Sequence, residues 1–186
     1  MARHKQEPTE KVESSLVDTL TITCKGSRTT SKLLELGQYD FVDGQITDEF
    51  FPLKAHAPEQ HVLEFIGFSE GFQYKAALSR VFRDFERRGL EKTTLEDALE
   101  FTIQYPWKDP DTIDRMSSVD HVRELQTCTI IFPEGVASNA SPFDRHIPCY
   151  WKLTNFKRKP RLELEPSYHL YLFSAWRPVF VGLRKQ

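Results

Sequence analysis

The chain has 186 residues, of which 39% are hydrophobic and 28% charged, and its formal net charge is −2. The mixture of 14 Phe and 3 Trp with only 8 Gly excludes a low-complexity or collagen-like chain. No apolar run approaches the roughly 20 residues that a membrane helix needs, so we expect a soluble protein without a membrane partner. We predict a mobile tail over residues 1–14 and a single α+β domain over residues 15–186.

The N-terminus and the cysteines indicate the cellular compartment. Residues 1–15 are polar and contain no apolar segment of the kind that a secretory signal requires. The three cysteines, Cys24, Cys128 and Cys149, are scattered along the chain and match no disulfide framework. We therefore expect a cytoplasmic protein with free thiols.

Strands are expected in the N-terminal part of the predicted domain. Apolar residues alternate with threonines over residues 19–24, and residues 61–68 form a second apolar run. Between them, Asp43-Gly44 separates residues 39–42 from residues 45–47. Asp-Gly is the preferred pair of a two-residue type I′ turn, because both positions take a positive φ. This pattern predicts a β-hairpin.

Two to three helices are expected in the middle of the chain. Apolar residues at helical spacing follow Ser69, which can cap the first helix, and Gly89 can end it. Thr93 and Glu96 match a capping box that would open a second helix. A third helical stretch is predicted from Asp109-Pro110, because proline is favoured at the first helical position.

The C-terminal part is predicted to form an antiparallel β-meander. The apolar run over residues 127–132 predicts a strand that is followed by a loop over residues 136–147. Short turn segments separate four further apolar runs, over residues 148–156, 161–165, 168–175 and 179–183. The order of strands, then helices, then strands favours an α+β fold over a doubly wound parallel one.

One short motif indicates a possible catalytic serine. Residues 67–71, GFSEG, fit G-x-S-x-G between a predicted strand and a predicted helix. This stretch resembles the nucleophile elbow of α/β-hydrolases, and the resemblance implies a small serine hydrolase that uses Ser69, Asp144 and His169. The alternative is that Ser69 is only the N-cap of its helix. We favour the cap, so no catalytic residue is predicted and the hydrolase is kept as an alternative function.

Neither a metal site nor a cofactor is predicted. Histidine and cysteine are suitable zinc ligands, but only His146 and Cys149 form a tight pair, while His121 and Cys128 are more widely spaced. The glycines form neither a G-x-G-x-x-G nor a P-loop motif.

Charge is distributed unevenly along the chain. Residues 145–186 contain nine Lys and Arg but only two Glu, a net charge of +7. The preceding 144 residues carry 16 basic and 25 acidic side chains, a net charge of −9. This asymmetry indicates an anionic partner for the C-terminal part.

The basic meander is the predicted binding surface. Basic side chains neutralise phosphates, and exposed aromatic rings stack on unpaired bases. We therefore hypothesise a non-enzymatic binding module for an anionic partner, with nucleic acid favoured over an acidic protein surface and a protein–protein adaptor or subunit as a further alternative. The predicted contact residues are Lys157, Arg158, Lys159 and Arg161, with Trp176 and Arg177 at a neighbouring turn. The alternative for the aromatic residues is that they fill the core.

Overall fold

The structure is a computed structural model that describes residues 14–68, 77–105, 127–136, 149–156, 159–166 and 179–184. Within these residues it contains three helices and an eight-stranded mixed sheet, which confirms the predicted α+β class. Residues 1–13 of the predicted tail, the third helical stretch and the strand over residues 168–175 lie outside the described residues, whereas Ser14, which was assigned to the tail, begins the first strand.

The strands are β1 (Ser14–Cys24), β2 (Phe41–Val42), β3 (Glu59–Phe68), β4 (Leu90–Lys92), β5 (Thr127–Val136), β6 (Cys149–Phe156), β7 (Lys159–Pro166) and β8 (Val179–Arg184). The helices are α1 (Thr30–Gly37), α2 (Ala77–Arg88) and α3 (Leu95–Gln104). None of these helices is long and apolar enough to span a membrane.

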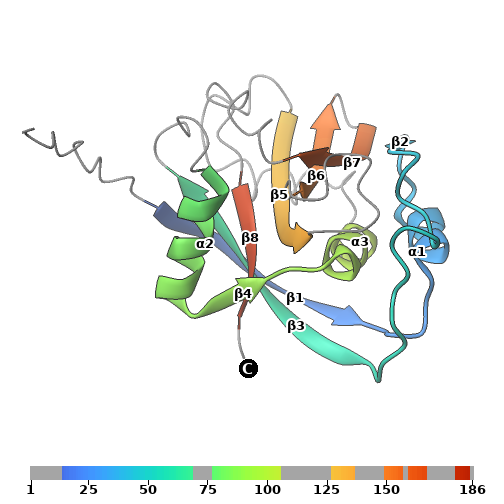
Figure 1. Ribbon diagram of the computed structural model, residues 1–186, viewed down its shortest axis with the longest axis horizontal. Helices are drawn as coiled ribbons and strands as arrows, with labels where there is room; N and C mark the ends of the chain where they lie inside the picture. Colours follow the sequence, from blue (N-terminus) through green and yellow to red (C-terminus); the bar gives the residue numbers. More distant parts are fainter. Residues whose placement is uncertain are drawn as a thin grey trace, which may run out of the picture.

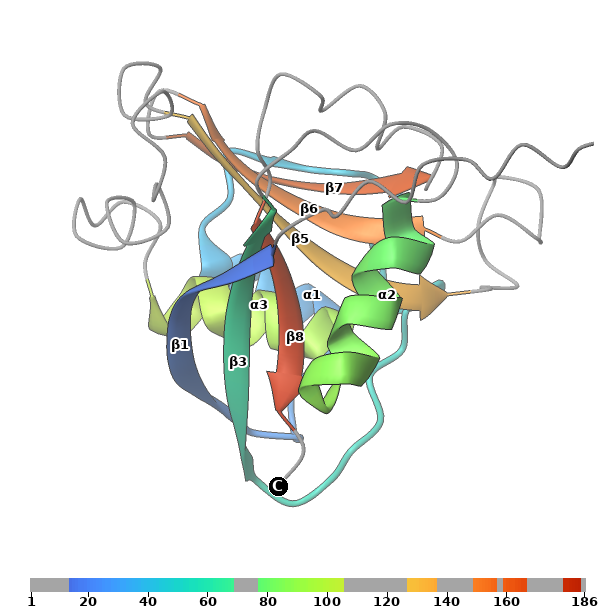
Figure 2. The ribbon, with the colours of Figure 1, turned by 90° about the vertical axis from the view of Figure 1, so that its left-hand side faces the viewer.

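The main sheet has the strand order β1-β3-β8-β5-β6-β7-β2. Neighbouring strands are antiparallel except for two parallel pairs, β5 with β8 and β2 with β7. β4 lies outside this order and pairs with the last residues of β8. β8 therefore lies in the middle of the sheet, with β3 on one side (Figure 2) and with β5 and β4 paired to its other edge.

Helices cover both faces of the sheet. α2 packs on one face, whereas α3 and α1 lie on the other (Figures 1 and 2). Because side chains alternate along a strand, β3 directs Leu63 and Phe65 into the core beneath α3 and Ile66 and Phe68 into the core beneath α2. We refer to these as the α3-side core and the α2-side core.

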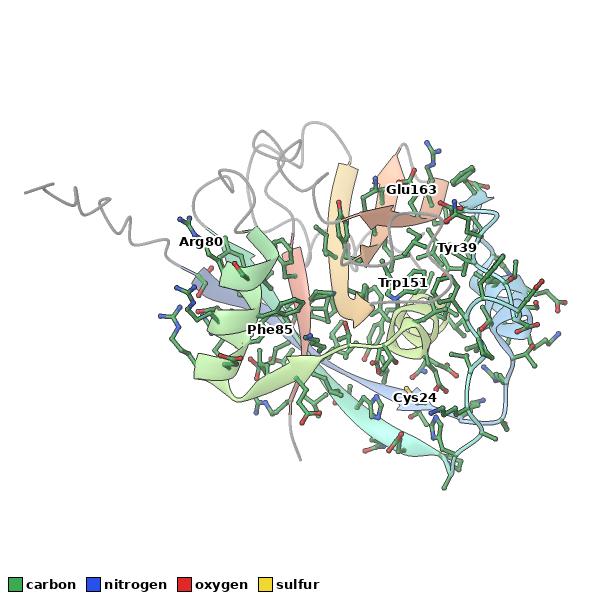
Figure 3. The ribbon with its side chains drawn as sticks, viewed as in Figure 1. Cys24, Tyr39, Arg80, Phe85, Trp151 and Glu163 are labelled. Carbon is green, nitrogen blue, oxygen red and sulfur yellow. The ribbon has the colours of Figure 1, made fainter. Side chains whose placement is uncertain are left out.

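The two cores differ in size. The α3-side core is the larger and includes Leu20, Ile22, Leu63, Phe65, Leu99, Phe101, Ile130, Phe132, Trp151, Leu153, Val179 and Val181. The α2-side core contains Ile66, Phe68, Val81, Phe85, Leu90, Ile131, Tyr150 and Phe180. Phe85 points from α2 toward the strands, and Arg80 lies on the outward side of the helix (Figure 3).

The second predicted helix is present, but its capping box lies one residue later than predicted. The side chain of Thr94 accepts a hydrogen bond from the backbone N–H of Asp97, and the Asp97 carboxylate accepts one from the N–H of Thr94. Thr93 is buried, and Glu96 turns toward the β1–α1 connection, where it accepts a hydrogen bond from the N–H of Gly26. The acidic residue of the capping box is therefore Asp97 at the third helical position, and not Glu96 as the sequence pattern predicted.

The end of the first predicted helix is confirmed. α2 ends at Arg88, and Gly89 follows with a φ of 70°. Glycine is favoured after a helix because it adopts this left-handed conformation without a Cβ clash. The predicted cap, Ser69, lies outside the described residues.

The predicted hairpin at Asp43-Gly44 is wrong. Residues 45–47 form no strand, and β2 pairs in parallel with Arg161 and Leu162 of β7 instead. The Asp43 carboxylate accepts a hydrogen bond from the N–H of Gln45, and Gly44 does not adopt a positive φ. A local turn of this kind gives the aspartate carboxylate a hydrogen-bond donor and does not require the positive φ of a type I′ hairpin.

The predicted meander is confirmed for its first two strands, β6 and β7, and corrected for its last. β5, β6 and β7 are antiparallel neighbours, and β5 continues through Pro133 with a shift of register before Val136. β8 instead leaves the meander and inserts between β3 and β5. α1 was not predicted, because Leu33 is its one fully buried apolar residue and a helix of eight residues shows little periodicity.

Candidate functional site

Most residues of the predicted basic surface lie outside the described part of the structure. These are Lys157, Arg158, Trp176 and Arg177, together with the side chain of Lys159. The backbone on either side of Lys157 and Arg158 is described, and Phe156 of β6 pairs with Lys159 of β7. The predicted hairpin between these two strands is therefore confirmed.

Arg161 is the predicted contact residue whose side chain the structure describes. Its guanidinium carbon lies 4.5 Å from the centre of the Phe41 ring, and its side chain is 42% exposed. Glu163 lies 3.7 Å from the guanidinium but also 2.9 Å from the ammonium of the buried Lys152. Glu163 therefore interacts with both cations, and Phe41 holds Arg161 at the surface.

The aromatic residues of these strands do not form the predicted stacking surface where the structure describes them. Tyr150, Trp151 and Phe180 are fully buried, the first and last in the α2-side core and Trp151 in the α3-side core. The ring of Phe51 packs edge-on against Trp151 at 4.7 Å between centroids. These rings lie in the core and not on a stacking surface, because burying each ring removes a large apolar area from water.

The residues of the alternative hydrolase triad, Ser69, Asp144 and His169, also lie outside the described residues. The strand before Ser69 is described, and both of its neighbours, β1 and β8, are antiparallel to it. A nucleophile elbow follows a strand of an α/β-hydrolase sheet, and the resemblance implies a parallel sheet around that strand. The described surroundings of β3 therefore do not favour this alternative.

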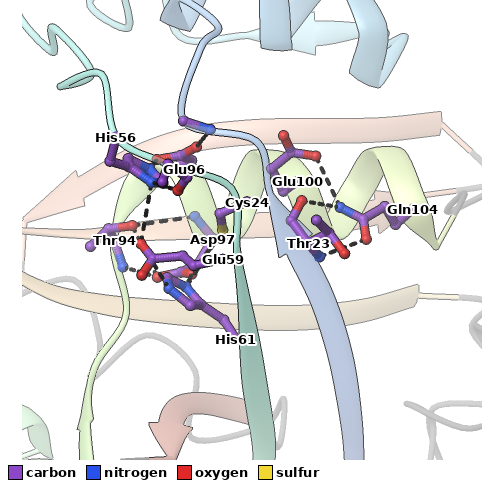
Figure 4. A network of polar contacts seen from close by, with 12 residues as sticks. Thr23, Cys24, His56, Glu59, His61, Thr94, Glu96, Asp97, Glu100 and Gln104 are labelled. Carbon is purple, nitrogen blue, oxygen red and sulfur yellow. Dashed lines mark hydrogen bonds and ion pairs between the residues drawn. The ribbon is translucent and has the colours of Figure 1, made fainter. Parts of the chain in front are cut away.

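A cluster of polar side chains lies where β1 and β3 meet the first turn of α3 (Figure 4). His61 Nδ1 lies 2.6 Å from Asp97 Oδ1 and 3.5 Å from Cys24 Sγ, and Cys24 Sγ lies 3.7 Å from the same Asp97 oxygen. Cys24 and Asp97 are fully buried, and the His61 side chain is 19% exposed. Three side chains with metal-binding atoms therefore converge at one point. We refer to Cys24, His61 and Asp97 as the Cys–His–Asp cluster.

The Cys–His–Asp cluster is surrounded by further charged groups. Glu59 Oε1 lies 3.3 Å from His61 Nε2 and 3.3 Å from His56 Nδ1, and His56 Nε2 lies 2.9 Å from Glu96 Oε2. The other Asp97 oxygen accepts hydrogen bonds from the N–H and the hydroxyl of Thr94, at 2.7 and 2.9 Å. These outer groups fix the orientation of both His61 and Asp97.

Electrostatics distinguish the cysteine from the histidines. Burial, together with the negative charges of Asp97, Glu96 and Glu100, raises the pKa of the Cys24 thiol well above its ordinary value. The hydrogen bond to Asp97 raises the pKa of His61, although burial opposes it, and the hydrogen bond to Glu96 raises the pKa of His56. Without a bound cation, Cys24 is therefore a neutral thiol.

This arrangement is unsuited to a cysteine nucleophile. In a catalytic triad the histidine uses one ring nitrogen for the nucleophile and the other for the carboxylate. Here a single nitrogen, Nδ1 of His61, faces both Cys24 and Asp97. Reactive cysteines are also partly exposed with a lowered pKa, and Cys24 has neither property.

The Cys–His–Asp cluster was missed by sequence reasoning. Alternation along residues 19–24 and 61–68 could have placed Cys24 and His61 on inward faces. Their approach depends on the pairing of Ile22 with His61 and of Cys24 with Glu59, which the sequence does not indicate. Asp97 was missed for a local reason, because the capping box was assigned one residue too early.

Comparisons with protein-family models, with curated proteins and with solved structures find no match to this chain.

Proposed function

We propose that this protein is a non-enzymatic binding module that contacts nucleic acid through basic residues around the β6–β7 hairpin. The observation that carries the proposal is the net charge of +7 over residues 145–186, in a chain whose preceding residues carry −9. Three consecutive cations, Lys157 to Lys159, fall at the end of two strands whose pairing is described. A local excess of positive charge attracts the phosphates of a nucleic acid, and this attraction does not depend on the nucleotide sequence.

The described ion pairs support this assignment by showing which cations are already neutralised. Lys152 pairs with Glu163, and Arg184 Nε lies 2.7 Å from Glu64 on the neighbouring strand β3. Glu163 is one of two acidic residues within residues 145–186, and its shorter contact, 2.9 Å, is with Lys152. Arg161, whose side chain is 42% exposed, adds a further cation close to the turn of the hairpin.

The burial of the aromatic rings refines the expected mode of binding. Tyr150, Trp151 and Phe180 lie in the core and cannot stack on bases, and the exposed ring of Phe41 already lies against the Arg161 guanidinium. We therefore expect contacts to phosphates, with little base specificity and a strong dependence on salt. Trp176 and Arg177 remain secondary contact residues of the proposal.

The test measures the binding of labelled single-stranded RNA, single-stranded DNA and duplex DNA between about 50 and 200 mM salt. We expect the logarithm of the binding constant to fall linearly with the logarithm of salt concentration. The Lys157→Glu/Arg158→Glu/Lys159→Glu variant should bind more weakly. For this variant, the slope of the logarithm of the binding constant against the logarithm of salt concentration should be shallower by about 0.7–0.9 for each phosphate that is no longer neutralised.

A matched control separates a local surface from net charge. Lys25, Lys54 and Arg83 are exposed and lie on other parts of the molecule. The Lys25→Glu/Lys54→Glu/Arg83→Glu variant has the same change in charge and should retain most of the binding. Equal losses in the two variants would contradict a site at the hairpin, and no binding by the unaltered protein at low salt would overturn the proposal for nucleic acid.

A further inference from the structure

We propose that Cys24, His61 and Asp97 bind a divalent transition-metal ion of the zinc type, through Sγ, Nδ1 and Oδ1. This site is separate from the β6–β7 hairpin and does not depend on the proposed contact with nucleic acid. Thiolate, imidazole and carboxylate are the three protein ligand types that zinc takes. Their ligand atoms come from three separate elements, β1, β3 and α3 (Figure 4).

The distances between the ligand atoms are close to those of a tetrahedral site. Zinc–ligand bonds of about 2.3 Å to sulfur and 2.0–2.1 Å to nitrogen and oxygen place sulfur about 3.6 Å from either lighter atom. The corresponding distances from Cys24 Sγ are 3.5 Å to His61 Nδ1 and 3.7 Å to Asp97 Oδ1. The distance between His61 Nδ1 and Asp97 Oδ1, 2.6 Å, needs to lengthen by roughly 0.7 Å. Binding of the ion therefore requires the imidazole and the carboxylate to move apart by this amount.

The groups behind the three ligands form the outer shell that metal sites require. A metal-bound histidine usually donates its other ring N–H to a carboxylate, and Glu59 Oε1 lies 3.3 Å from His61 Nε2. A metal-bound carboxylate is usually itself hydrogen-bonded, and the free oxygen of Asp97 accepts two hydrogen bonds from Thr94. Both ligands are therefore oriented with their metal-binding atoms toward Cys24.

The electrostatic surroundings favour a cation. Glu96, Asp97 and Glu100 are buried side by side along α3, with His56 and Arg28 as partners of the first and last. A dication between Cys24, His61 and Asp97 adds positive charge to this acidic region. Its binding releases the Cys24 proton and any proton on His61 Nδ1 to solvent, and no redox change is involved. Because the protein supplies three ligands, we assign the fourth position of the tetrahedron to water.

The test uses Co²⁺ as the probe, with Zn²⁺ in competition, on the full chain under reducing conditions. We expect one equivalent of Co²⁺ to give the near-ultraviolet band of a thiolate–cobalt bond and visible bands of tetrahedral intensity, and one equivalent of Zn²⁺ to abolish both. Cys24→Ser should remove the thiolate band. His61→Gln should weaken binding by at least the factor of about 10–100 that loss of an outer-shell partner alone causes.

Two controls keep the test decisive. His56→Gln alters a histidine of the same region whose nitrogens face Glu96 and Glu59, so the thiolate band should persist. Cys128→Ser/Cys149→Ser leaves Cys24 as the single thiol, and it too should retain the band. If Cys24→Ser does not fold, as judged by near-ultraviolet circular dichroism, His61→Gln and the two controls still decide the question. Absence of a thiolate band in the folded unaltered protein, or its persistence in folded Cys24→Ser, would overturn the proposal.

Discussion

The two helices that pack against opposite faces of the sheet, α3 and α2, bury side chains of different kinds. α3 is enclosed between the sheet and α1, and all its residues from Leu95 to Thr102 are buried, including three carboxylates. α2 buries one side, with Val81 and Phe85 beneath it and Arg83 and Arg87 exposed.

This difference shows that a charged side chain needs a partner when its helix is buried but not when it is exposed to solvent. On α3 each buried carboxylate faces a cationic partner or a donor, since an unpaired buried charge is costly. Asp97 faces His61, Glu96 faces His56, and Glu100 lies 3.6 Å from Arg28. On α2 the exposed arginines are solvated, so their charge costs little even without a partner. Mutations on the α3 side should therefore cost more stability than comparable mutations on the α2 side.

The largest expected difference lies between two phenylalanines. Phe101 of α3 is fully buried, with ring centroids of Phe65, Tyr105 and Phe132 at 5.4, 5.7 and 5.8 Å. Phe101→Ala should lower the free energy of unfolding by about 3–5 kcal/mol. Phe82→Ala on the partly exposed side of α2 should lower it by about 1 kcal/mol. Urea denaturation measures both values, and equal losses would contradict the contrast between the two sides.

The next effect concerns the one buried carboxylate of α2. Asp84 Oδ2 accepts hydrogen bonds from Ser14 and Arg88, at 2.7 and 2.8 Å, and Arg87 contacts the other oxygen. Burial alone would raise the pKa of Asp84, but the hydrogen bonds from Arg88 and Ser14 and the two arginine charges outweigh it, so the pKa is lowered. At neutral pH, Asp84→Asn should destabilise the protein by about 1–2 kcal/mol.

This second effect should depend on pH in a defined direction. A carboxyl group whose pKa is lowered by folding contributes stability above its unfolded pKa, which is about 4. That contribution is lost as the pH falls through the lower pKa of the folded state. The difference in stability between the unaltered protein and Asp84→Asn should therefore be constant near neutrality and shrink below about pH 4. A difference that grows on acidification would show that Asp84 is not held as a carboxylate.

The smallest effect distinguishes two neighbouring threonines at the start of α3. Thr94→Ala removes the capping hydroxyl and should cost about 1 kcal/mol. Among the residues that the structure describes, none forms a hydrogen bond with the buried hydroxyl of Thr93. Thr93→Val should therefore leave the stability unchanged or raise it slightly, because no hydrogen bond is broken. Thermal unfolding of the two variants measures both changes in stability. A larger loss of stability for Thr93→Val than for Thr94→Ala would indicate that Thr93, and not Thr94, caps the helix.

Sequence patterns predicted those parts of the fold that depend on local periodicity. Alternation located β1, apolar runs located β3 and β6, and helical spacing with a terminal glycine located α2. The insertion of β8 and the parallel pairing of β2 could not be predicted, because both depend on contacts between distant segments. The Cys–His–Asp cluster depends on such contacts as well: Cys24 and Asp97 are 73 positions apart in the chain.

The position of β8 also determines when the sheet can form. During synthesis β1 and β3 emerge first, and a two-stranded ribbon is at best marginally stable in water. Until residues 179–184 leave the ribosome, the inner edge of β3 has no strand to pair with, although it becomes the middle of the sheet. The contact between Arg184 and Glu64 spans 120 positions, so it can form only after the whole segment between them has been synthesised. Contacts of such long range slow folding and leave strand edges open to aggregation, so the nascent chain should depend on chaperones until its final strand is available.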